Sequence, residues 1–367
     1  MRLTKPLLAA TAVMLSLSAA SQADENAHAN AVAKAINYLR TTGQAADGSF
    51  SKQVGPAVTA ICVTAIMQNG RSPDDPVVSR GLKYLEKFVA ADGGIHLKGT
   101  TYRNYDTSLS LVCFSKANQD GRYDKIIKKA DSFLKKIQWD KEEGHDEASF
   151  SHGGAGYGKH KRPDLNNTAH LIEALKAAGN GADSEAMKKA LLFVSRCQNL
   201  ETEHNKTPFS TKVQDGGFYY TPAAGGSNPD LLAKTAAGAL RSYGSMTYSG
   251  LKSMIYAGLS KDDPRVKAAV TWAGKNYDLT SNPGLGAHGY FYYVHTLAKA
   301  LDAAGADIIT DAEGKKHDWR KELTAELVRR QAADGSWLNK TPRWLEGDPN
   351  LVTGYALMTL SHCRPKK

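Results

Sequence analysis

Amphipathic and apolar segments alternate along the whole chain. Six segments carry charged residues between apolar ones at helical intervals, and each is followed by a segment richer in small and apolar residues. A charged helix followed by a drier one, six times over, predicts two concentric rings with the drier helices lining the centre. The predicted amphipathic helices are residues 26–42, 75–90, 123–138, 184–198, 264–277 and 319–332, and the predicted drier helices are residues 54–69, 105–118, 165–178, 246–258, 289–304 and 350–362.

A short motif recurs where the amphipathic segments end. Residues 331–337 read Gln-Ala-Ala-Asp-Gly-Ser-Trp, residues 44–50 are nearly identical, and residues 91–95 and 214–219 are variants, whereas the third and fifth repeats have largely lost the motif. Glycine after the last helical residue permits the left-handed conformation that ends a helix. Closure of such an array removes both exposed ends, and neither end carries a capping repeat. We therefore predict an all-α (α/α)6 toroid, with an open helical array as the alternative.

This motif resembles the repeat of squalene-hopene cyclases, oxidosqualene cyclases and protein prenyltransferase beta subunits, and the resemblance spans residues 26–363. More narrowly, residues 162–168, 243–248, 282–284 and 289–293 resemble exported bacterial prenyltransferase and squalene-oxidase repeat proteins. The resemblance implies the fold of the terpene cyclase and protein prenyltransferase superfamily, and a function like that of its transferases or isomerases.

The chain departs from these families in its chemical motifs. Adjacent aspartates occur only at residues 74–75 and 262–263, each pair before a proline at a predicted helix start, where they suit capping. The Asp-rich acid motif of the hopene-forming cyclases is therefore absent. The aspartate, cysteine and histidine that hold zinc in the prenyltransferases also have no counterpart, so we expect no metal and no cofactor.

The first 23 residues have the pattern of an export signal. Arg2 and Lys5 precede an apolar run, and residues 21–23 (Ser-Gln-Ala) place small side chains at the two positions that a signal peptidase reads. We predict a signal peptide over residues 1–23 and a single toroid domain over residues 24–367, located in the periplasm or outside the cell. No later segment is apolar enough to predict a membrane span, so we do not expect an integral membrane protein.

The net charge bears on nucleic-acid binding, and the cysteines bear on metal binding and disulfide formation. The formal net charge is +10, but the basic residues are spread along helices, so we expect no nucleic-acid partner. The four cysteines form no Cys-x-x-Cys pair, so thiolate metal binding is not predicted. Cys62 and Cys113 are the pair to test for a disulfide in an oxidising compartment, and buried free thiols are the alternative.

Polar and aromatic residues gather at the starts of the predicted drier helices. In a two-ring toroid these starts converge on one mouth of a central cavity, where unpaired amide donors favour anionic groups. Helix capping is the alternative role for the aspartates, and core packing is the alternative for the tyrosines. The candidate catalytic residues are Asp106, Asp164, Tyr248, Tyr292 and His295. The candidate cavity residues are Tyr102, Tyr105, Asn167, His170, Ser245, Lys252, Tyr290, Tyr293 and Trp344.

Three functions fit this lining. A protein that binds isoprenoids would hold a hydrophobic small molecule or membrane-derived lipid among aromatic faces, which stabilise carbocations. If it also converts the ligand, Asp106 or Asp164 would serve as the acid. An exported polysaccharide lyase or hydrolase would bind an acidic glycan and pair Tyr248 or Tyr292 with His295. A scaffold would bind without chemistry. The repeat resemblance favours the first function, and a Tyr–His pair within hydrogen-bond reach would favour the second.

Overall fold

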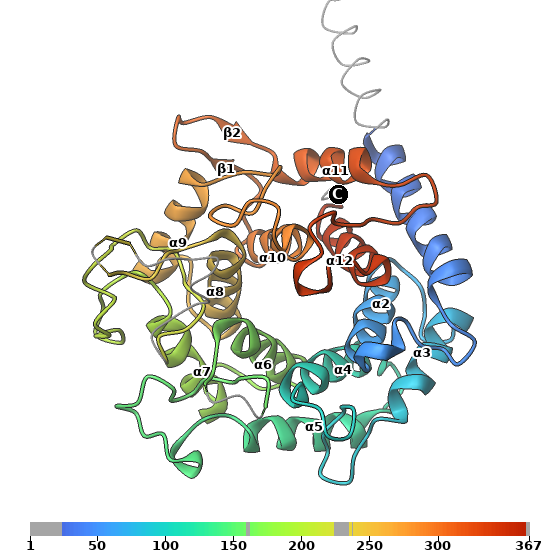
Figure 1. Cartoon of the computed structure of the whole chain (residues 1–367), viewed down its shortest axis with the longest axis horizontal. Coiled ribbons are helices and arrows are strands. Elements are labelled where there is room, and N and C mark those ends of the chain that lie inside the picture. Colours follow the sequence, from blue (N-terminus) through green and yellow to red (C-terminus); the bar gives the residue numbers. More distant parts are fainter. Residues whose placement is uncertain (1–23, 159–161, 224–234, 237, 365–367) are drawn as a thin grey trace, which may run out of the picture.

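The helices form two concentric rings (Figure 1). The computed structural model describes residues 24–158, 162–223, 235–236 and 238–364, and the predicted signal peptide lies outside these residues. Within the described residues the inner ring consists of α2 (Ala57–Gln68), α4 (Arg103–Ala117), α6 (Leu165–Ala177), α8 (Gly244–Tyr256), α10 (Tyr290–Ala303) and α12 (Pro349–His362). The outer ring consists of a helix over residues 24–38 that ends in the π-helical turn η1 (Leu39–Gly43), followed by α3 (Pro76–Glu86), α5 (Asp124–Lys136), α7 (Glu185–Arg196), α9 (Pro264–Lys275) and α11 (Trp319–Arg330). The predicted all-α toroid is confirmed.

The two ends of the repeat array meet and close both rings. Helix α12 packs against α10 on one side and α2 on the other. Asn69, just after α2, donates through Nδ2 to the carbonyl oxygen of Leu357 in α12 (2.9 Å). In the outer ring, the side-chain amide of Gln331 after α11 donates to the carbonyl oxygen of Ala31 in the first helix (2.9 Å). The alternative of an open array is therefore wrong, because the last repeat contacts the first.

In four of the repeats a glutamine at the end of the outer helix joins that repeat to the next. Its side-chain amide donates one hydrogen bond to the carbonyl oxygen of the motif glycine and another to a carbonyl oxygen of the following outer helix. Gln138 in the third repeat and Gln198 in the fourth make the same pair of bonds, but longer loops separate them from their glycines and obscure the motif in the sequence. In the fourth repeat the sequence motif pointed to Gln214, whose side-chain amide instead donates to the carbonyl oxygen of Ser210. The four sets are Gln44 with Gly48 and Val77, Gln138 with Gly153 and Ala186, Gln198 with Gly216 and Arg265, and Gln331 with Gly335 and Ala31.

The glycine of the motif is required by a close approach of two backbones. Gly335 has a φ of 92°, and a Cβ atom added to it would lie 2.5 Å from the carbonyl oxygen of Lys34 in the next outer helix. Gly70 has a similar φ of 89° but has open space around it. Residues other than glycine are disfavoured at both positions by the backbone conformation, and at Gly335 also by the clash.

A threonine early in the inner helix fixes the leading end of that helix to the motif loop. Its hydroxyl oxygen accepts a hydrogen bond of 2.9–3.2 Å from the backbone N–H of the residue that ends the motif. Because five repeats share this bond, the inner helices begin at the same end of the toroid, which we call the mouth. The pairs are Thr59 with Phe50, Thr107 with Ile95, Thr168 with Ala155, Thr247 with Phe218 and Thr353 with Trp337.

Short elements lie in the connections. The 3-10 turns are η2 (Lys52–Val54), η3 (Lys141–Glu143) and η5 (Arg343–Leu345), and β1 (Ile309–Thr310) pairs antiparallel with β2 (Lys316–His317). In this hairpin the His317 ring lies between the carboxylates of Asp311 (Nε2–Oδ2, 3.0 Å) and Glu322 (Nδ1–Oε2, 2.9 Å). The hydrogen bonds to Asp311 and then Glu322 raise the pKa of His317.

The cysteines are free thiols. Cys62, Cys113, Cys197 and Cys363 are all buried and none forms a disulfide. The Cys62 thiol donates to the carbonyl oxygen of Asn350 (3.3 Å), which adds a contact between α2 and α12. In the described part of the chain, no helix combines the length and apolarity needed to cross a bilayer.

Candidate functional site

Four aromatic side chains meet in a closed circle at the axis of the ring. Tyr105 of α4 contacts His170 of α6 edge-on (5.1 Å between ring centroids), and His170 contacts Tyr292 of α10 (6.4 Å). Tyr292 contacts Tyr355 of α12 (5.8 Å), and the Tyr355 hydroxyl lies 3.3 Å from that of Tyr105. Helix α8 separates α6 from α10, and α2 separates α12 from α4, so these contacts are made across the interior of the inner ring. We call these four residues the axial aromatic circle.

Two more rings extend this circle. Tyr157, in the loop before α6, contacts Tyr105 (6.0 Å), and His295 of α10 stacks on Tyr355 (5.6 Å). Tyr105, His170, Tyr292 and His295 were predicted on the cavity side, and the structure brings them together. Tyr355 was not among the predicted residues. It lies two residues after the motif threonine of α12, the position that His170 occupies in α6, so the threonine register would have indicated it.

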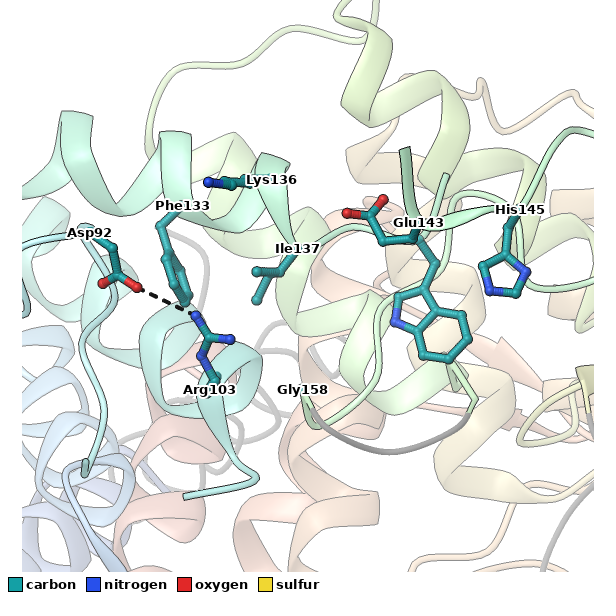
Figure 2. A pocket seen from close by; sticks show the side chains of 9 residues that line it. Asp92, Arg103, Phe133, Lys136, Ile137, Glu143, His145 and Gly158 are labelled. Carbon is teal, nitrogen blue, oxygen red and sulfur yellow. Dashed lines mark hydrogen bonds and ion pairs between the residues drawn. The ribbon is translucent and has the colours of Figure 1, made fainter. Parts of the chain in front are cut away.

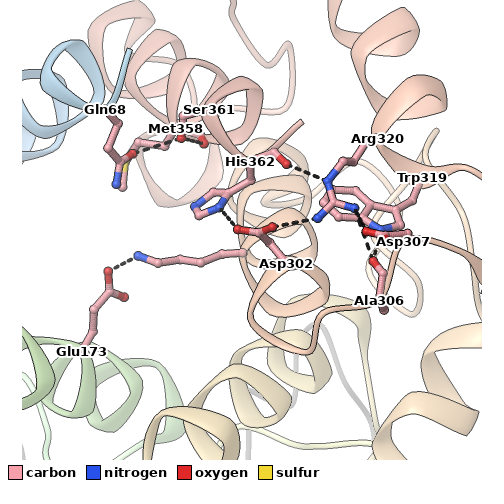
Figure 3. A network of polar contacts seen from close by, with 11 residues as sticks. Gln68, Glu173, Asp302, Ala306, Asp307, Trp319, Arg320, Met358, Ser361 and His362 are labelled. Atoms are coloured by element: carbon pink, nitrogen blue, oxygen red, sulfur yellow. Dashed lines mark hydrogen bonds and ion pairs between the residues drawn. The ribbon is translucent and has the colours of Figure 1, made fainter. Parts of the chain in front are cut away.

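A buried cluster of charges lies one helical turn further from the mouth. The Glu173 carboxylate of α6 accepts hydrogen bonds from the ammonium groups of Lys252 in α8 (2.9 Å) and Lys299 in α10. Figure 3 shows Glu173 and its contact with the lysine of α10. Their side chains are 13%, 3% and 6% exposed, respectively. Although burial raises the pKa of Glu173, the charges of the two lysines lower it well below its usual value. We call these three residues the axial charge cluster.

Only Lys252 of this cluster was predicted. Glu173 lies five residues after the motif threonine of α6, and Lys252 lies five residues after the motif threonine of α8. Lys299 follows His295 by one turn on α10, so both side chains lie on the same face of that helix. A charged residue within an otherwise apolar inner helix is the signal that would have indicated all three.

Two neutral histidines lie next to the charge cluster: His170, which belongs to the aromatic circle, and His295, which stacks on it. Burial, and then the charge of Lys252, lower the pKa of His170 to about 3. Burial, and then the charge of Lys299, lower the pKa of His295 well below its usual value. The two side chains are 7% and 6% exposed, and His170 Nε2 and His295 Nδ1 have no hydrogen-bond partner. The site therefore contains two unused hydrogen-bonding atoms.

The two candidate aspartates occupy different environments. Asp164 caps α6 by accepting hydrogen bonds from the backbone N–H (2.8 Å) and side-chain amide (2.9 Å) of Asn167, and burial raises its pKa to about 6. Asn167 in turn accepts a bond from the side-chain amide of Asn104 in α4 (3.3 Å). The capping alternative is thus confirmed for Asp164, and Asn167 serves to hold it.

Asp106 is not a cap, because it lies within the first turn of α4. Its side chain is buried against Gly55, in the loop before α2, and accepts a hydrogen bond from the backbone N–H of Leu97. Burial raises the pKa of Asp106 to about 8. This carboxyl group is therefore mainly protonated at neutral pH.

The predicted Tyr–His pair is not formed in the described structure. The Tyr292 hydroxyl bonds to the Ser249 hydroxyl (3.2 Å). The Tyr248 hydroxyl has no partner, and its ring packs against Tyr293 (5.8 Å between centroids). Neither tyrosine is hydrogen-bonded to His295, so these residues do not provide a ready acid–base pair.

Tyr290 and Tyr293 face the outer ring and not the axis, which corrects their predicted place in the cavity. The Tyr290 hydroxyl donates to the carbonyl oxygen of Leu279 (2.7 Å), and Arg330 lies over its ring (4.1 Å). The Tyr293 hydroxyl donates to the carbonyl oxygen of Asp278 (2.7 Å). Consecutive helical residues point in directions about 100° apart, so only Tyr292 of this run reaches the axis.

Three other predicted cavity residues lie at the mouth. Ser245 is buried and bonded to the side-chain amide of Asn282 in the loop before α10 (3.3 Å). Tyr102 and Trp344 are 48% and 53% exposed, so they border the mouth and do not line the axis. Near Trp344, the buried carboxylate of Glu346 accepts from the backbone N–H of Tyr292 (2.8 Å) and so caps α10.

A separate pocket of about 540 Å³ lies outside the inner ring, beside the leading end of α4 (Figure 2). On one side Arg103 pairs with Asp92 (3.4 Å) and lies over the ring of Phe133 (4.9 Å). On the other side Trp139 stacks on His145 (4.8 Å between centroids). None of the predicted catalytic or cavity residues lines this pocket.

At the end opposite the mouth, a surface network ties α10, α11 and α12 together (Figure 3). Arg320 pairs with Asp302 (2.7 Å) and Asp307 (2.8 Å), and His362 bonds to Asp302 (2.9 Å). The hydrogen bond from His362, and then Arg320, lower the pKa of Asp302 to about 2. These ion pairs join the ends of three helices, and we assign the network a structural role, although His362 Nε2 has no hydrogen-bond partner.

Comparison with known proteins agrees with this architecture. The family model of the squalene-hopene cyclase C-terminal domain matches residues 53–221. Similar solved structures include the type II terpene cyclase MstE from Scytonema without ligand (14% identity, covering 92% of this chain and 97% of that chain, TM-score 0.53). A variant of that enzyme in complex with the substrate geranylgeranyl dihydroxybenzoate is 13% identical, and the match covers 93% of this chain and 99% of that chain with a TM-score of 0.55. A second variant, in complex with the product merosterolic acid A, is 14% identical, and the match covers 93% of this chain and 98% of that chain with a TM-score of 0.53. No curated protein matches the sequence.

Proposed function

Because this chain is a terpene cyclase-like α/α toroid, we propose that it binds an isoprenoid-like hydrophobic ligand along the axis of the ring. The closed circle of Tyr105, His170, Tyr292 and Tyr355 is the observation that carries the proposal. Aromatic faces bury hydrocarbon and attract cations, so they suit both an isoprenoid chain and a carbocation formed from it. The Scytonema cyclase structure with a geranylgeranyl substrate supports this class of ligand.

The proposal extends to conversion of the ligand, with Asp106 as the acid and Asp164 as the base. A pKa of about 8 keeps Asp106 protonated at neutral pH, and a pKa of about 6 leaves Asp164 mainly ionised. Two carboxyl groups whose environments separate their pKa values can divide the two roles. Transfer of the Asp106 proton to a carbon–carbon double bond yields a carbocation and the Asp106 carboxylate, and the carbocation then loses a proton to Asp164. Exchange of protons with water returns Asp106 to its protonated form and Asp164 to its ionised form, as their pKa values of about 8 and about 6 favour, so the net reaction is an isomerisation without a co-reactant.

We further propose that the ligand is derived from a membrane lipid and that the protein acts outside the cytoplasm. The support is the export signal pattern of residues 1–23. Cell fractionation and N-terminal sequencing of the mature protein test this. We expect a mature chain that begins at Asp24, and an intact Met1 in a cytoplasmic protein would refute it.

Mass spectrometry of molecules that co-purify with the native protein tests ligand binding. We expect an isoprenoid in the wild type and in Tyr355→Phe, which keeps the ring, and at least tenfold less in Tyr355→Ala. Tyr84→Phe, on the outer helix α3, is the matched control and should retain the ligand. Absence of any isoprenoid from the wild type, or equal amounts in Tyr355→Ala, would contradict the proposal. The melting temperature of each variant confirms that it folds.

Binding of an acidic glycan is a second candidate function, favoured by the pocket beside α4. Its stacked Trp139 and His145 provide an aromatic platform for a sugar ring. Arg103 is paired with Asp92, and Lys136, which also lines the pocket, provides a positive charge. Protection against thermal unfolding by acidic oligosaccharides, lost in Trp139→Ala but kept in Tyr355→Ala, would favour this function. Protection that is unchanged in Trp139→Ala would exclude the pocket as the glycan site.

A further inference from the structure

The axial charge cluster carries one uncompensated positive charge in the interior of the toroid. Lys252 and Lys299 contribute two positive charges, and Glu173 contributes one negative charge. All three side chains are almost fully removed from solvent, so water compensates the remaining charge poorly. Burial of an unbalanced charge is costly, and a bound counter-charge removes that cost.

Two further polar atoms in the same region lack partners. His170 precedes Glu173 by one turn on α6, and His295 precedes Lys299 by one turn on α10, so each histidine shares a helix face with a member of the cluster. His170 Nε2 and His295 Nδ1 are buried and have no hydrogen-bond partner. A neutral imidazole can donate an N–H to an anion, and buried polar atoms are normally hydrogen-bonded.

We propose that the axial charge cluster binds the carboxylate head group of the ligand, with His170 and His295 as additional hydrogen-bond donors. A carboxylate supplies the single negative charge that neutralises the cluster, and two oxygens that accept from ammonium and imidazole groups. The cluster lies one turn beyond the aromatic circle, so the ligand enters head first and its hydrocarbon chain lies against the rings toward the mouth. This inference rests on the proposed function, because it assigns the position of one end of that ligand.

Two probes with the same hydrocarbon chain test the inference. Geranylgeranoic acid carries a carboxylate, and geranylgeraniol carries an uncharged hydroxyl in its place. We expect the wild-type protein to bind the acid at least tenfold more tightly than the alcohol in calorimetric titrations. This comparison needs no variant, so it holds even if a substitution in the cluster prevents folding.

Substitutions within the cluster should change the acid preference in opposite directions. Lys252→Met and Lys299→Met, each made alone, bring the net charge of the cluster to zero. Each should reduce the ratio of the affinity for the acid to that for the alcohol to below threefold and leave the affinity for the alcohol unchanged. Glu173→Gln adds a second net positive charge and should increase the ratio. Lys176→Met removes an exposed lysine from the end of the same helix α6 and serves as the control that leaves the ratio unchanged.

The outcomes separate the inference from the function on which it rests. Equal affinity of the wild type for acid and alcohol would overturn the inference and leave isoprenoid binding intact. A cluster with only a structural role would give variants in which both affinities fall together, and Glu173→Gln would then share the loss; this also overturns the inference. Binding of neither probe would overturn both proposals.

Discussion

Replacement of Asp106 by asparagine should stabilise the protein in a pH-dependent manner. The folded protein raises the pKa of this carboxyl group from 3.8 to about 8 through burial. Between these two values the native state keeps a proton that the unfolded state releases, so the free energy of unfolding falls as the pH rises. At pH 7, keeping Asp106 protonated costs about 4 kcal/mol relative to a carboxyl with its ordinary pKa. Asparagine does not titrate and is similar in size, so it avoids this cost.

Urea denaturation followed by circular dichroism, over a series of pH values, measures the effect. The difference in unfolding free energy between Asp106→Asn and the wild type should be smallest below about pH 3, where both states of the wild type are largely protonated. It should grow as the pH rises past 3.8 and level off above about pH 8. The new amide adds an offset of about 1 kcal/mol that does not depend on pH. Asp183→Asn, at an exposed position, should show a difference within about 0.5 kcal/mol at every pH. A difference that is constant with pH would refute the assignment of Asp106 as a protonated carboxyl.

Further predictions concern the repeat and the hairpin. Gly335→Ala should lower the free energy of unfolding by about 2 kcal/mol more than Gly70→Ala, because both residues have positive φ but only Gly335 meets a backbone carbonyl; equal losses in denaturation experiments would exclude the close approach. Gln331→Ala removes two hydrogen bonds, one that closes the outer ring at Ala31 and one within the motif loop at Gly335, and should cost about 2 kcal/mol, whereas the exposed Gln119→Ala should cost less than about 0.5 kcal/mol; a melting temperature unchanged in both would contradict this. Because folding raises the pKa of His317, its ion pairs stabilise the protein fully below the ordinary pKa of 6.5, and this stability is lost as the pH rises through the folded pKa. His317→Gln should therefore destabilise the protein more at about pH 6 than at about pH 9. A larger loss of stability at high pH would show that the ring is held as a neutral group.

The sequence predicted which helices line the centre, but it predicted only some of the side chains that reach the axis. Tyr292 and Tyr290 are two residues apart on one predicted helix, and both were expected at the centre. The contacts place Tyr292 on the axis and Tyr290 against Arg330 of the outer ring. Helical periodicity separates the faces of a helix, but the rotation of that helix against its neighbours decides which aromatic face is axial. The missing information in this case is the packing of α10 against α8, α11 and α12.

The number of repeats, the alternation of outer and inner helices, and the loop motif of the first and last repeats could all be read from the amino-acid sequence. These features depend on residues near one another in the chain, whose spacing follows directly from helix geometry and turn chemistry. The contacts of Tyr105 with Tyr355 and of Glu173 with Lys299 follow from the closed ring, because residues of distant repeats come together at one depth only when the ring closes. Burial then set the protonation of Asp106 and the histidines, since the loss of water around a side chain is a property of its neighbours in space.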